Sequence, residues 1–273
     1  MKVEKERVDI LLVQQGLFSS REQAKRAVMA GQILGENEER LDKAGQKIPV
    51  ITSLHFKGER LPYVSRGGLK LAKAIEDYDL KLQDQIVLDI GSSTGGFTDV
   101  SLQNGAKRVY ALDVGTNQLV WQLRTDSRVT VMENTNFRYV HLADFQDGQP
   151  TFATIDVSFI SLGLILPTLD QILSQAGQVV ALIKPQFEAG RESVGKHGII
   201  KDPTVHLAVL KKALQMMIDN HFTVQGLTFS PIKGGQGNIE FLALLQHASK
   251  AQINPGIDPQ EVVNLAHSQL DQQ

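Results

Sequence analysis

The sequence predicts an α/β fold in which a small α+β unit precedes a doubly wound, mainly parallel sheet of seven strands. Seven short apolar runs, each long enough for one strand, recur between residues 85 and 246. Helical stretches separate most of these runs, and strand–helix alternation is typical of a parallel sheet covered on both faces. The first 60 residues lack this alternation, so we expect a separate domain there.

The composition is that of a globular protein with a full hydrophobic core. The chain has 273 residues, of which 42% are hydrophobic and 6% aromatic. Cysteine is absent, which excludes disulfides, cysteine zinc sites and a thiol nucleophile. No segment has the length and hydrophobicity of a membrane span or a secretory signal. We therefore expect a cytoplasmic protein that needs no membrane and no metal. Since the net charge is −2, nucleic-acid binding would depend on a local basic patch.

We expect the N-terminal domain to span residues 1–60. The stretch 9–32 predicts two short helices joined by a turn at Gly16, and short extended pieces follow at 47–52 and 53–56. Residues 57–68 mix charge, proline and a pair of glycines, and we interpret them as a linker.

The second predicted domain, residues 61–249, contains the seven strands. We expect these strands at 85–90, 108–114, 128–133, 152–159, 178–184, 222–230 and 239–246. We expect helices at 68–78, 116–124, 162–174 and 204–219. Because only a glycine-rich loop joins the last two strands, they should be antiparallel. Residues 250–273 are polar, and we expect them to form a C-terminal tail.

A glycine-rich turn after the first strand of this domain indicates a nucleoside-containing cofactor. The glycines of "LDIGSSTGGFTDV" allow a tight turn that presents the N-terminus of the next helix. Asp113 ends the second strand, where a carboxylate can bind a ribose diol. A dinucleotide site would need G-x-G-x-x-G, whereas the wider glycine gap here favours S-adenosylmethionine. The candidate cofactor residues are Asp89, Gly91, Ser93, Thr94, Gly95, Gly96, Phe97, Asp113 and Asn134.

Four charged residues are predicted to meet at the carboxyl edge of the sheet, where ligands bind in doubly wound folds. Asp156 and Lys184 end consecutive strands, Lys70 follows the glycine pair that opens the first helix, and Glu240 opens the last strand. Each of them alone has an ordinary explanation, such as a solvated strand end. Together they predict one pocket that contains two cations and two carboxylates.

At these motifs the chain resembles a known family. "YVSRGGLKL", "LDIGSSTGGFTDV", "DVSFISL", "IKPQFEAGR" and "GNIEFL" closely resemble the TlyA family of ribosomal RNA methyltransferases, also labelled hemolysin A-like, from about Arg7 to about His247. The resemblance implies an RNA-binding module of the S-four type followed by an FtsJ-like, Rossmann-like methyltransferase domain. It also implies methyl transfer from S-adenosylmethionine to a ribose 2′-hydroxyl of a cytidine in 23S, and in some members 16S, ribosomal RNA.

The resemblance assigns a catalytic tetrad to Lys70, Asp156, Lys184 and Glu240. A ribose hydroxyl is a poor nucleophile while it carries its proton, so the enzyme must activate and aim its oxygen. Lys184 is expected to act as a base or as a cation that stabilises the forming alkoxide, and the sequence leaves both roles open.

The resemblance places RNA binding on basic side chains of the first domain and the linker: Arg7, Arg21, Lys25, Arg26 and Arg66. Such modules bind RNA through clustered cations that contact phosphates. The second half of this domain is acidic, so residues 1–60 contain eleven Lys and Arg against nine Asp and Glu. Ribosomal RNA, or a ribosomal subunit, is the expected partner.

Three other functions remain open at this point. The hemolysin label suggests a cytolysin, although the sequence shows no export signal or membrane-active segment. An NAD-dependent oxidoreductase could use the same fold, but the glycine spacing disfavours it. A catalytically silent RNA-binding protein is the third alternative, and the complete set of motifs disfavours that one.

Overall fold

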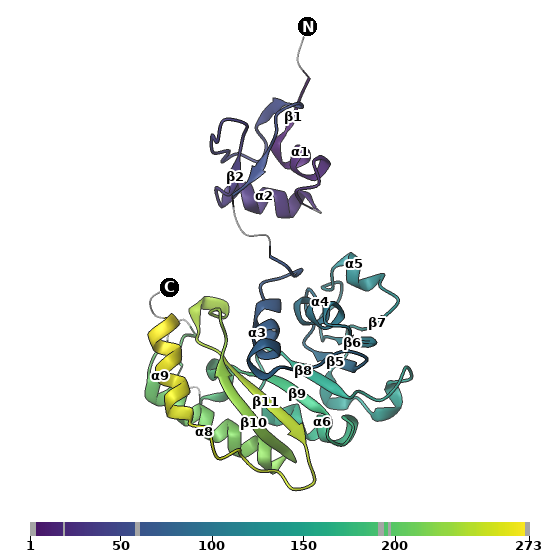
Figure 1. Cartoon of the computed structure of the whole chain (residues 1–273), viewed down its shortest axis with the longest axis vertical. Coiled ribbons are helices and arrows are strands. Elements are labelled where there is room, and N and C mark those ends of the chain that lie inside the picture. Colours follow the sequence, from purple (N-terminus) through teal and green to yellow (C-terminus); the bar gives the residue numbers. More distant parts are fainter. Residues whose placement is uncertain (1–3, 19, 58–60, 191–193, 196–197, 271–273) are drawn as a thin grey trace. The chain divides into compact units, whose positions relative to one another are not determined.

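The computed structural model describes residues 4–18, 20–57, 61–190, 194–195 and 198–270. The chain divides into two compact units, Met1–Leu61 and Pro62–Gln273, and each is described by itself (Figure 1).

The first unit is a small α+β domain. Its elements are β1 (Lys5–Arg7), α1 (Val8–Gln14), α2 (Arg21–Met29), β2 (Ile33–Leu34), β3 (Lys47–Pro49) and β4 (His55–Phe56). β1 pairs antiparallel with β3, and β2 pairs antiparallel with β4. Apolar residues three and four positions apart on the two helices, such as Val8, Leu12, Ala24 and Val28, form the core of this unit, as expected for amphipathic helices.

The second unit contains a seven-stranded sheet, as predicted. In spatial order the strands are β10 (Phe222–Phe229), β11 (Phe241–His247), β9 (Gln178–Ile183), β8 (Phe152–Ile155), β5 (Ile86–Ile90), β6 (Arg108–Leu112) and β7 (Val129–Met132). The strands from β9 to β7 are parallel to one another. β11 is antiparallel to both of its neighbours, which confirms the expected antiparallel finish.

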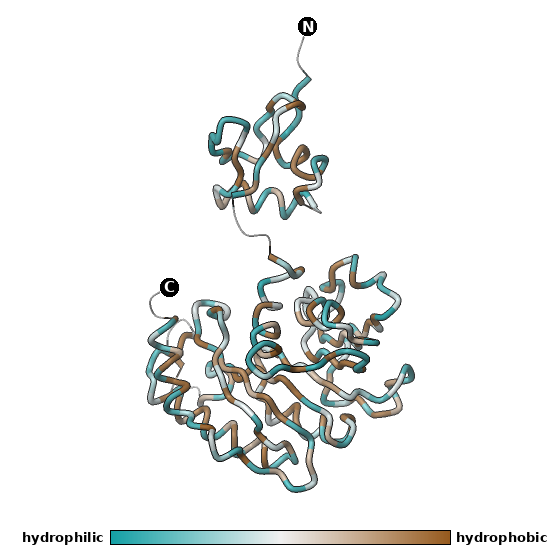
Figure 2. The backbone as a smooth tube through the Cα atoms, in the orientation of Figure 1, coloured by the Kyte–Doolittle hydropathy of each residue, from teal (hydrophilic) through white to brown (hydrophobic). Residues whose placement is uncertain are grey.

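Helices cover both faces of this sheet, so the fold is doubly wound. They are α3 (Gly68–Tyr78), α4 (Gly96–Gln103), α5 (Trp121–Arg124), α6 (Leu166–Ile172), α7 (Pro185–Glu188), α8 (Pro203–Asp219) and α9 (Pro259–Leu270). Successive residues of β5 belong to different cores: Val87 packs with α3 and α4, whereas Leu88 packs with α6 and α8. Figure 2 shows the resulting hydrophobic centre of the sheet. In the described part of the chain, no helix is long and apolar enough to span a membrane.

Four expected elements differ in the structure. The strand expected at 152–159 is limited to β8 and ends at Ile155. The helix expected at 116–124 is limited to α5, because the Glu133 carboxylate accepts the N–H groups of residues 117–119 and holds them in a loop. The helix expected at 162–174 is divided into a short 3-10 turn, Leu162–Leu164, and α6. The prediction of a tail at 250–273 is wrong, since that region forms α9, which packs on α8 and β10 through Val263, Ala266 and Leu270.

Candidate active site

The topology of the sheet brings the four predicted catalytic residues to one edge. Asp156 follows β8 and Lys184 follows β9, and the carboxyl ends of these parallel strands lie at the same edge. β11 runs in the opposite direction, and the pairing of Phe241 with Ile183 places Glu240 beside Lys184 at that edge. Lys70 reaches it from the first turn of α3.

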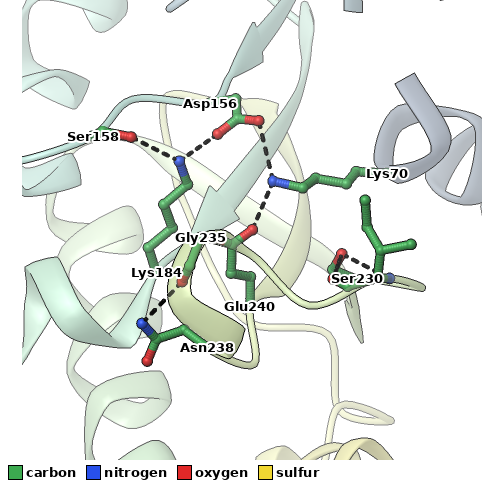
Figure 3. Close-up of polar contacts among 9 residues, drawn as sticks. Lys70, Asp156, Ser158, Lys184, Ser230, Gly235, Asn238 and Glu240 are labelled. Carbon is green, nitrogen blue, oxygen red and sulfur yellow. Dashed lines mark hydrogen bonds and ion pairs between the residues drawn. The ribbon is translucent and has the colours of Figure 1, made fainter. Parts of the chain in front are cut away.

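The four side chains form a continuous chain of ion pairs (Figure 3). Lys70 Nζ lies 2.7 Å from Glu240 Oε2 and 3.3 Å from Asp156 Oδ2. The other oxygen of Asp156, Oδ1, lies 2.5 Å from Lys184 Nζ. Lys184 Nζ also donates a hydrogen bond to Ser158 Oγ at 3.2 Å. Asp156 therefore binds both lysines, one through each carboxylate oxygen.

Burial makes these charges depend strongly on one another. Lys70 and Lys184 are only 7% and 8% exposed, and Glu240 is 2% exposed. Burial disfavours the ammonium of Lys70, but Asp156 and Glu240 outweigh that effect and raise its pKa. Burial likewise disfavours the Asp156 carboxylate, but the two lysines outweigh it and lower its pKa. Lys70 and Asp156 are therefore both charged across the neutral range.

Close contacts around the cluster explain why two nearby positions are glycine. A side chain on Gly234 would occupy the position of the Glu240 carboxylate. A side chain on Gly96 would meet Ser65 and the backbone at Gly68, so the start of α4 can pack against the start of α3 only if residue 96 has no Cβ. Lys70 lies in that first turn of α3.

Three further residues at this edge were not predicted. Ser158 lies two positions beyond Asp156, and the period-2 alternation of an extended chain could have revealed it. Asn238 is 2% exposed and connects two loops, since it accepts Ile200 N–H and donates to the Gly198 carbonyl. Glu188 is buried and accepts hydrogen bonds from Ser161 Oγ at 2.6 Å and Leu162 N–H at 2.7 Å, which attaches α7 to the loop after β8. The pairings of Asn238 and Glu188 are long-range and left no local signal.

A cavity of about 1580 Å³ extends along this edge from the glycine turn to the segment after β9. Five of the predicted cofactor residues line it: Gly91, Ser93, Thr94, Gly96 and Phe97. Lys70, Asp156, Lys184 and Glu240 line it as well. This volume is larger than the roughly 300–1,000 Å³ of a typical small-molecule pocket, so the cavity has room for two ligands.

Four predicted cofactor residues are not among those that line the cavity. Asp89 is fully buried and accepts hydrogen bonds from Thr98 and Thr154, at 2.7 and 2.9 Å. Burial raises its pKa to about 6 despite these two bonds. Gly95 has φ +98, and a side chain there would meet Leu119 and Leu123 rather than the cavity. Asp89 and Gly95 therefore stabilise the glycine turn without lining the cavity.

The other two residues, Asp113 after β6 and Asn134 after β7, support the loops beside the glycine turn. Asp113 accepts hydrogen bonds from Ser93 N–H and Gly115 N–H, both at 2.8 Å, and is 8% exposed. Asn134 is exposed, and its backbone N–H donates to the Gly115 carbonyl at 2.9 Å. Both residues thus stabilise the loops that border the glycine turn.

An aromatic pair also lines the cavity. The rings of Phe159 and Phe187 are 5.1 Å apart at an interplanar angle of 49°, and both residues line the cavity. Phe159 is 92% exposed and has φ +63, an unusual conformation for a bulky side chain. An apolar ring is thus exposed to solvent beside the charged cluster.

Of the predicted RNA-binding residues of the first unit, Arg7 is half-buried and the other three are exposed, and two of the four share one buried carboxylate. Asp9 accepts hydrogen bonds from Arg7 Nε and Arg21 Nη2, at 2.9 and 3.0 Å. These arginines lower the pKa of Asp9 to about 2, against the effect of burial. Lys25 and Arg26 are exposed on the same helix as Arg21. In the second unit, Arg66 is exposed in the turn that precedes α3.

A glycine turn after the first strand of a doubly wound sheet, with lysines and carboxylates at the same edge, defines the site of an enzyme that uses a nucleoside cofactor. Comparison with known proteins makes this class specific. Residues 63–247 match the FtsJ-like methyltransferase family, and the chain therefore belongs to that family.

Two relatives that match most of the chain are named as rRNA methyltransferases. A Bacillus subtilis protein, YqxC, provisionally named an rRNA methyltransferase, is 55% identical over 99% of this chain and 97% of that protein. The Mycobacterium tuberculosis 16S/23S rRNA (cytidine-2′-O)-methyltransferase TlyA is 36% identical over 88% of this chain and 89% of its own. The resemblance to the TlyA family is thereby confirmed.

Solved structures agree on the fold. A Streptococcus thermophilus chain, provisionally described as a hemolysin, is 57% identical, covers 99% of this chain and 98% of its own, and superposes with a TM-score of 0.80. A Listeria monocytogenes protein described as an S-adenosylmethionine-dependent methyltransferase has a TM-score of 0.51 at 14% identity, over 67% of this chain and 99% of its own. That second likeness supports the fold alone.

Proposed function

We propose that this protein transfers a methyl group from S-adenosylmethionine to the ribose 2′-hydroxyl of a cytidine in ribosomal RNA. The observation that supports this most is the buried Lys70–Asp156–Lys184–Glu240 cluster beside a cavity large enough for two ligands. The choice of ribosomal RNA and cytidine follows the names of the relatives. Such a protein would work in the cytoplasm, on 23S ribosomal RNA or the subunit that contains it.

The glycine-turn end of the cavity suits the cofactor. Ser92, Ser93 and Thr94 line the cavity just before α4 begins, so the start of a helix and its free N–H groups border this end. Asp113 accepts a hydrogen bond from Ser93 N–H, and we propose that it shapes this end by holding the backbone of the glycine turn. S-adenosylmethionine, when bound, supplies a methyl group that is already activated by a sulfonium.

The charged cluster suits the activation of a hydroxyl. Two hydrogen bonds orient the Lys184 ammonium, one to Asp156 and one to Ser158, which leaves its third N–H position for the ribose oxygen. Asp156 and Glu240 hold Lys70 charged, and Lys70 in turn keeps Asp156 ionised beside Lys184. In the proposed reaction an O–CH₃ bond forms, the S–CH₃ bond breaks and the hydroxyl loses its proton. If Lys184 is the base, its neutral amine takes that proton. If Lys184 is a stabilising cation, solvent takes the proton and the ammonium stabilises the forming alkoxide.

The exposed aromatic pair suits the other half of the substrate. A base that leaves its helix can stack on aromatic side chains, and Phe159 offers a solvent-exposed ring beside the reacting groups. The arginines of the first unit would contribute phosphate contacts.

Mapping of 2′-O-methyl groups on ribosomal RNA, in cells with and without this gene, tests the proposal. One cytidine or a small set should lose its modification, and the purified protein should restore it on subunits from the deletion strain. Unchanged maps, together with no methyl incorporation by the purified protein, would contradict the proposed activity.

Three relatives are described as hemolysins, two of them provisionally, so lysis of red cells needs its own measurement. Purified protein and its Lys184→Ala variant should both fail to lyse red cells at concentrations that methylate RNA. Lysis that is equal in both proteins would indicate a second activity unrelated to the cluster.

A further inference from the structure

Two short segments carry the reacting groups, and the sheet does not hold them to each other. Residues 156–164 follow β8 and begin with Asp156, and residues 184–189 follow β9 and begin with Lys184. The pairing of β8 with β9 ends at the last residue of β8. Among the described residues, no backbone–backbone hydrogen bond joins the two segments. Side-chain contacts therefore set the position of one segment relative to the other.

Three of these contacts involve a group that we propose touches the substrate. Lys184 Nζ binds Asp156 Oδ1 and Ser158 Oγ. The ring of Phe187 packs against that of Phe159. In the proposed reaction Lys184 also binds the ribose oxygen and Phe159 stacks on a base, so we expect these contacts to change when the substrate binds. A contact that stays constant needs a residue that does not react.

Glu188 makes such a contact. It is 7% exposed and is not among the residues that line the main cavity. Its carboxylate accepts hydrogen bonds from Ser161 Oγ at 2.6 Å and from Leu162 N–H at 2.7 Å. Ser161 Oγ also accepts Gly163 N–H at 3.2 Å, so the single hydrogen of the hydroxyl points to Glu188. One carboxylate of α7 thus caps the 3-10 turn of the other segment, both directly and through Ser161.

The two ends of this contact lie close to the groups that act in the proposed reaction. Glu188 ends the one-turn helix α7, whose N-cap is Lys184, so a shift of α7 displaces that lysine. Ser161 lies two residues beyond Phe159, whose φ of +63 is unfavourable for a bulky side chain and persists only where the surroundings enforce it. Because Phe159 is 92% exposed, its own packing gives that conformation little support. The hydrogen bonds to Glu188 fix the end of this strained turn.

We infer that Glu188 is a positioning residue, which keeps the segment that carries Asp156 and Phe159 in register with Lys184 while the substrate binds and reacts. The inference rests on the proposed function, because it assumes that these groups act on a nucleotide. Glu188 itself would touch neither the cofactor nor the substrate.

The test measures methyl transfer by full-length protein to ribosomal subunits that lack the modification. Glu188→Ala should lower kcat by about 10–100-fold, the scale of a displacement of about 1 Å at reacting groups, and leave S-adenosylmethionine affinity nearly unchanged. Glu188→Gln keeps an oxygen for Leu162 N–H and should retain most of the rate. Ser161→Ala removes one of the two hydrogen bonds and should lower kcat by less than Glu188→Ala. It replaces Glu188→Ala in the test if that variant does not fold.

Asp170→Ala is the matched control for lost stability. Asp170 Oδ1 lies 2.9 Å from Nε2 of the buried His247, at the opposite edge of the sheet from the site. Both alanine variants should unfold at a lower temperature than wild type, but the kcat of Asp170→Ala should match that of wild type. Equal losses of kcat in the two variants would show that Glu188 acts only through overall stability.

A double-mutant cycle with Phe159→Ala tests how Glu188 acts. If Glu188 maintains the turn that presents Phe159, the double variant should lose less kcat/KM than the product of the two single losses. Losses that multiply, or a wild-type kcat in Glu188→Ala, would overturn the inference and leave the proposed function intact. A wild type that methylates no ribosomal subunit would contradict the proposed function, and the inference with it.

Discussion

The two units of this protein each contain a carboxylate that binds two cations, but they expose those cations very differently. In the second unit the side chains of Lys70 and Lys184 are each 9% exposed on Asp156. In the first unit the side chains of Arg7 and Arg21 are 40% and 57% exposed on Asp9, which is itself buried.

This difference shows how one motif can serve two tasks. Burial of an ion pair costs desolvation, so a buried pair is weak evidence for stability and is often retained for another reason. In the second unit the reason we propose is the placement of charges at the reacting hydroxyl. The guanidiniums of the first unit are oriented by Asp9, and we propose that their exposed N–H groups bind phosphate oxygens.

The largest expected effect comes from removing Lys184, the cation that we propose contacts the substrate. Lys184→Ala should lower the methylation rate by about 10²–10⁴-fold, while calorimetry should show S-adenosylmethionine affinity close to wild type. Lys184→Arg keeps the charge but effectively cannot give up its proton. Substantial activity in the arginine variant would establish Lys184 as an electrostatic stabiliser, and near-full activity in the alanine variant would remove it from the mechanism.

The next effect tests whether the buried cluster depends on complete pairing. Glu240→Ala should lower the free energy of unfolding by about 3–5 kcal/mol, because it leaves the Lys70 ammonium with one partner in a buried site. Denaturant titration measures this decrease. The double variant Lys70→Met/Glu240→Leu, which removes the pair, should recover part of the stability. A single variant as stable as wild type would show that the Lys70–Glu240 pair is dispensable for folding.

Asp89 extends the comparison to a buried carboxylate whose hydrogen-bond partners are threonines and not cations. Its pKa is raised from 3.8 to about 6, so the folded protein binds this proton more tightly than the unfolded chain. The contribution of protonated Asp89 is therefore present at low pH and is lost as pH rises from about 4 to about 6, by ~3 kcal/mol.

Asp89→Asn should remove this pH dependence. The stability of the variant relative to wild type should increase between pH 4 and pH 7, as measured by denaturant titration at each pH. A constant difference across that range would show that Asp89 titrates alike in the folded and unfolded states.

The smallest effect is expected in the exposed cluster. Arg21→Ala/Lys25→Ala should weaken RNA binding modestly and lower the slope of log affinity against log salt by about 1 for each phosphate that the variant no longer binds. Cofactor affinity should stay the same. Lys107→Ala/Lys211→Ala removes two exposed lysines of the second unit and is the control for overall charge. Equal salt slopes in both double variants would show that the α2 face has no special role.

Much of the architecture could be predicted from local patterns. The alternation of apolar runs predicted seven strands and double winding, because each strand and helix must bury its own apolar residues. The glycine spacing and the strand-end positions of Asp156 and Lys184 predicted the edge where the site lies. Even α3 has the predicted bounds, since a glycine pair precedes its amphipathic pattern.

Only the tertiary structure decided how the charged groups pair, which residues face the cavity and where the C-terminal region packs. Asp89 and Asp113 have the residue type and spacing of ligand-binding carboxylates, yet hydrogen bonds from distant threonines and backbone N–H groups engage them. The sequence predicted a polar tail for the last residues, because their few apolar side chains become core residues only when α8 and β10 supply a surface for them. Hydrogen bonds and packing of this kind join residues far apart in the chain, and no local pattern encodes such partners.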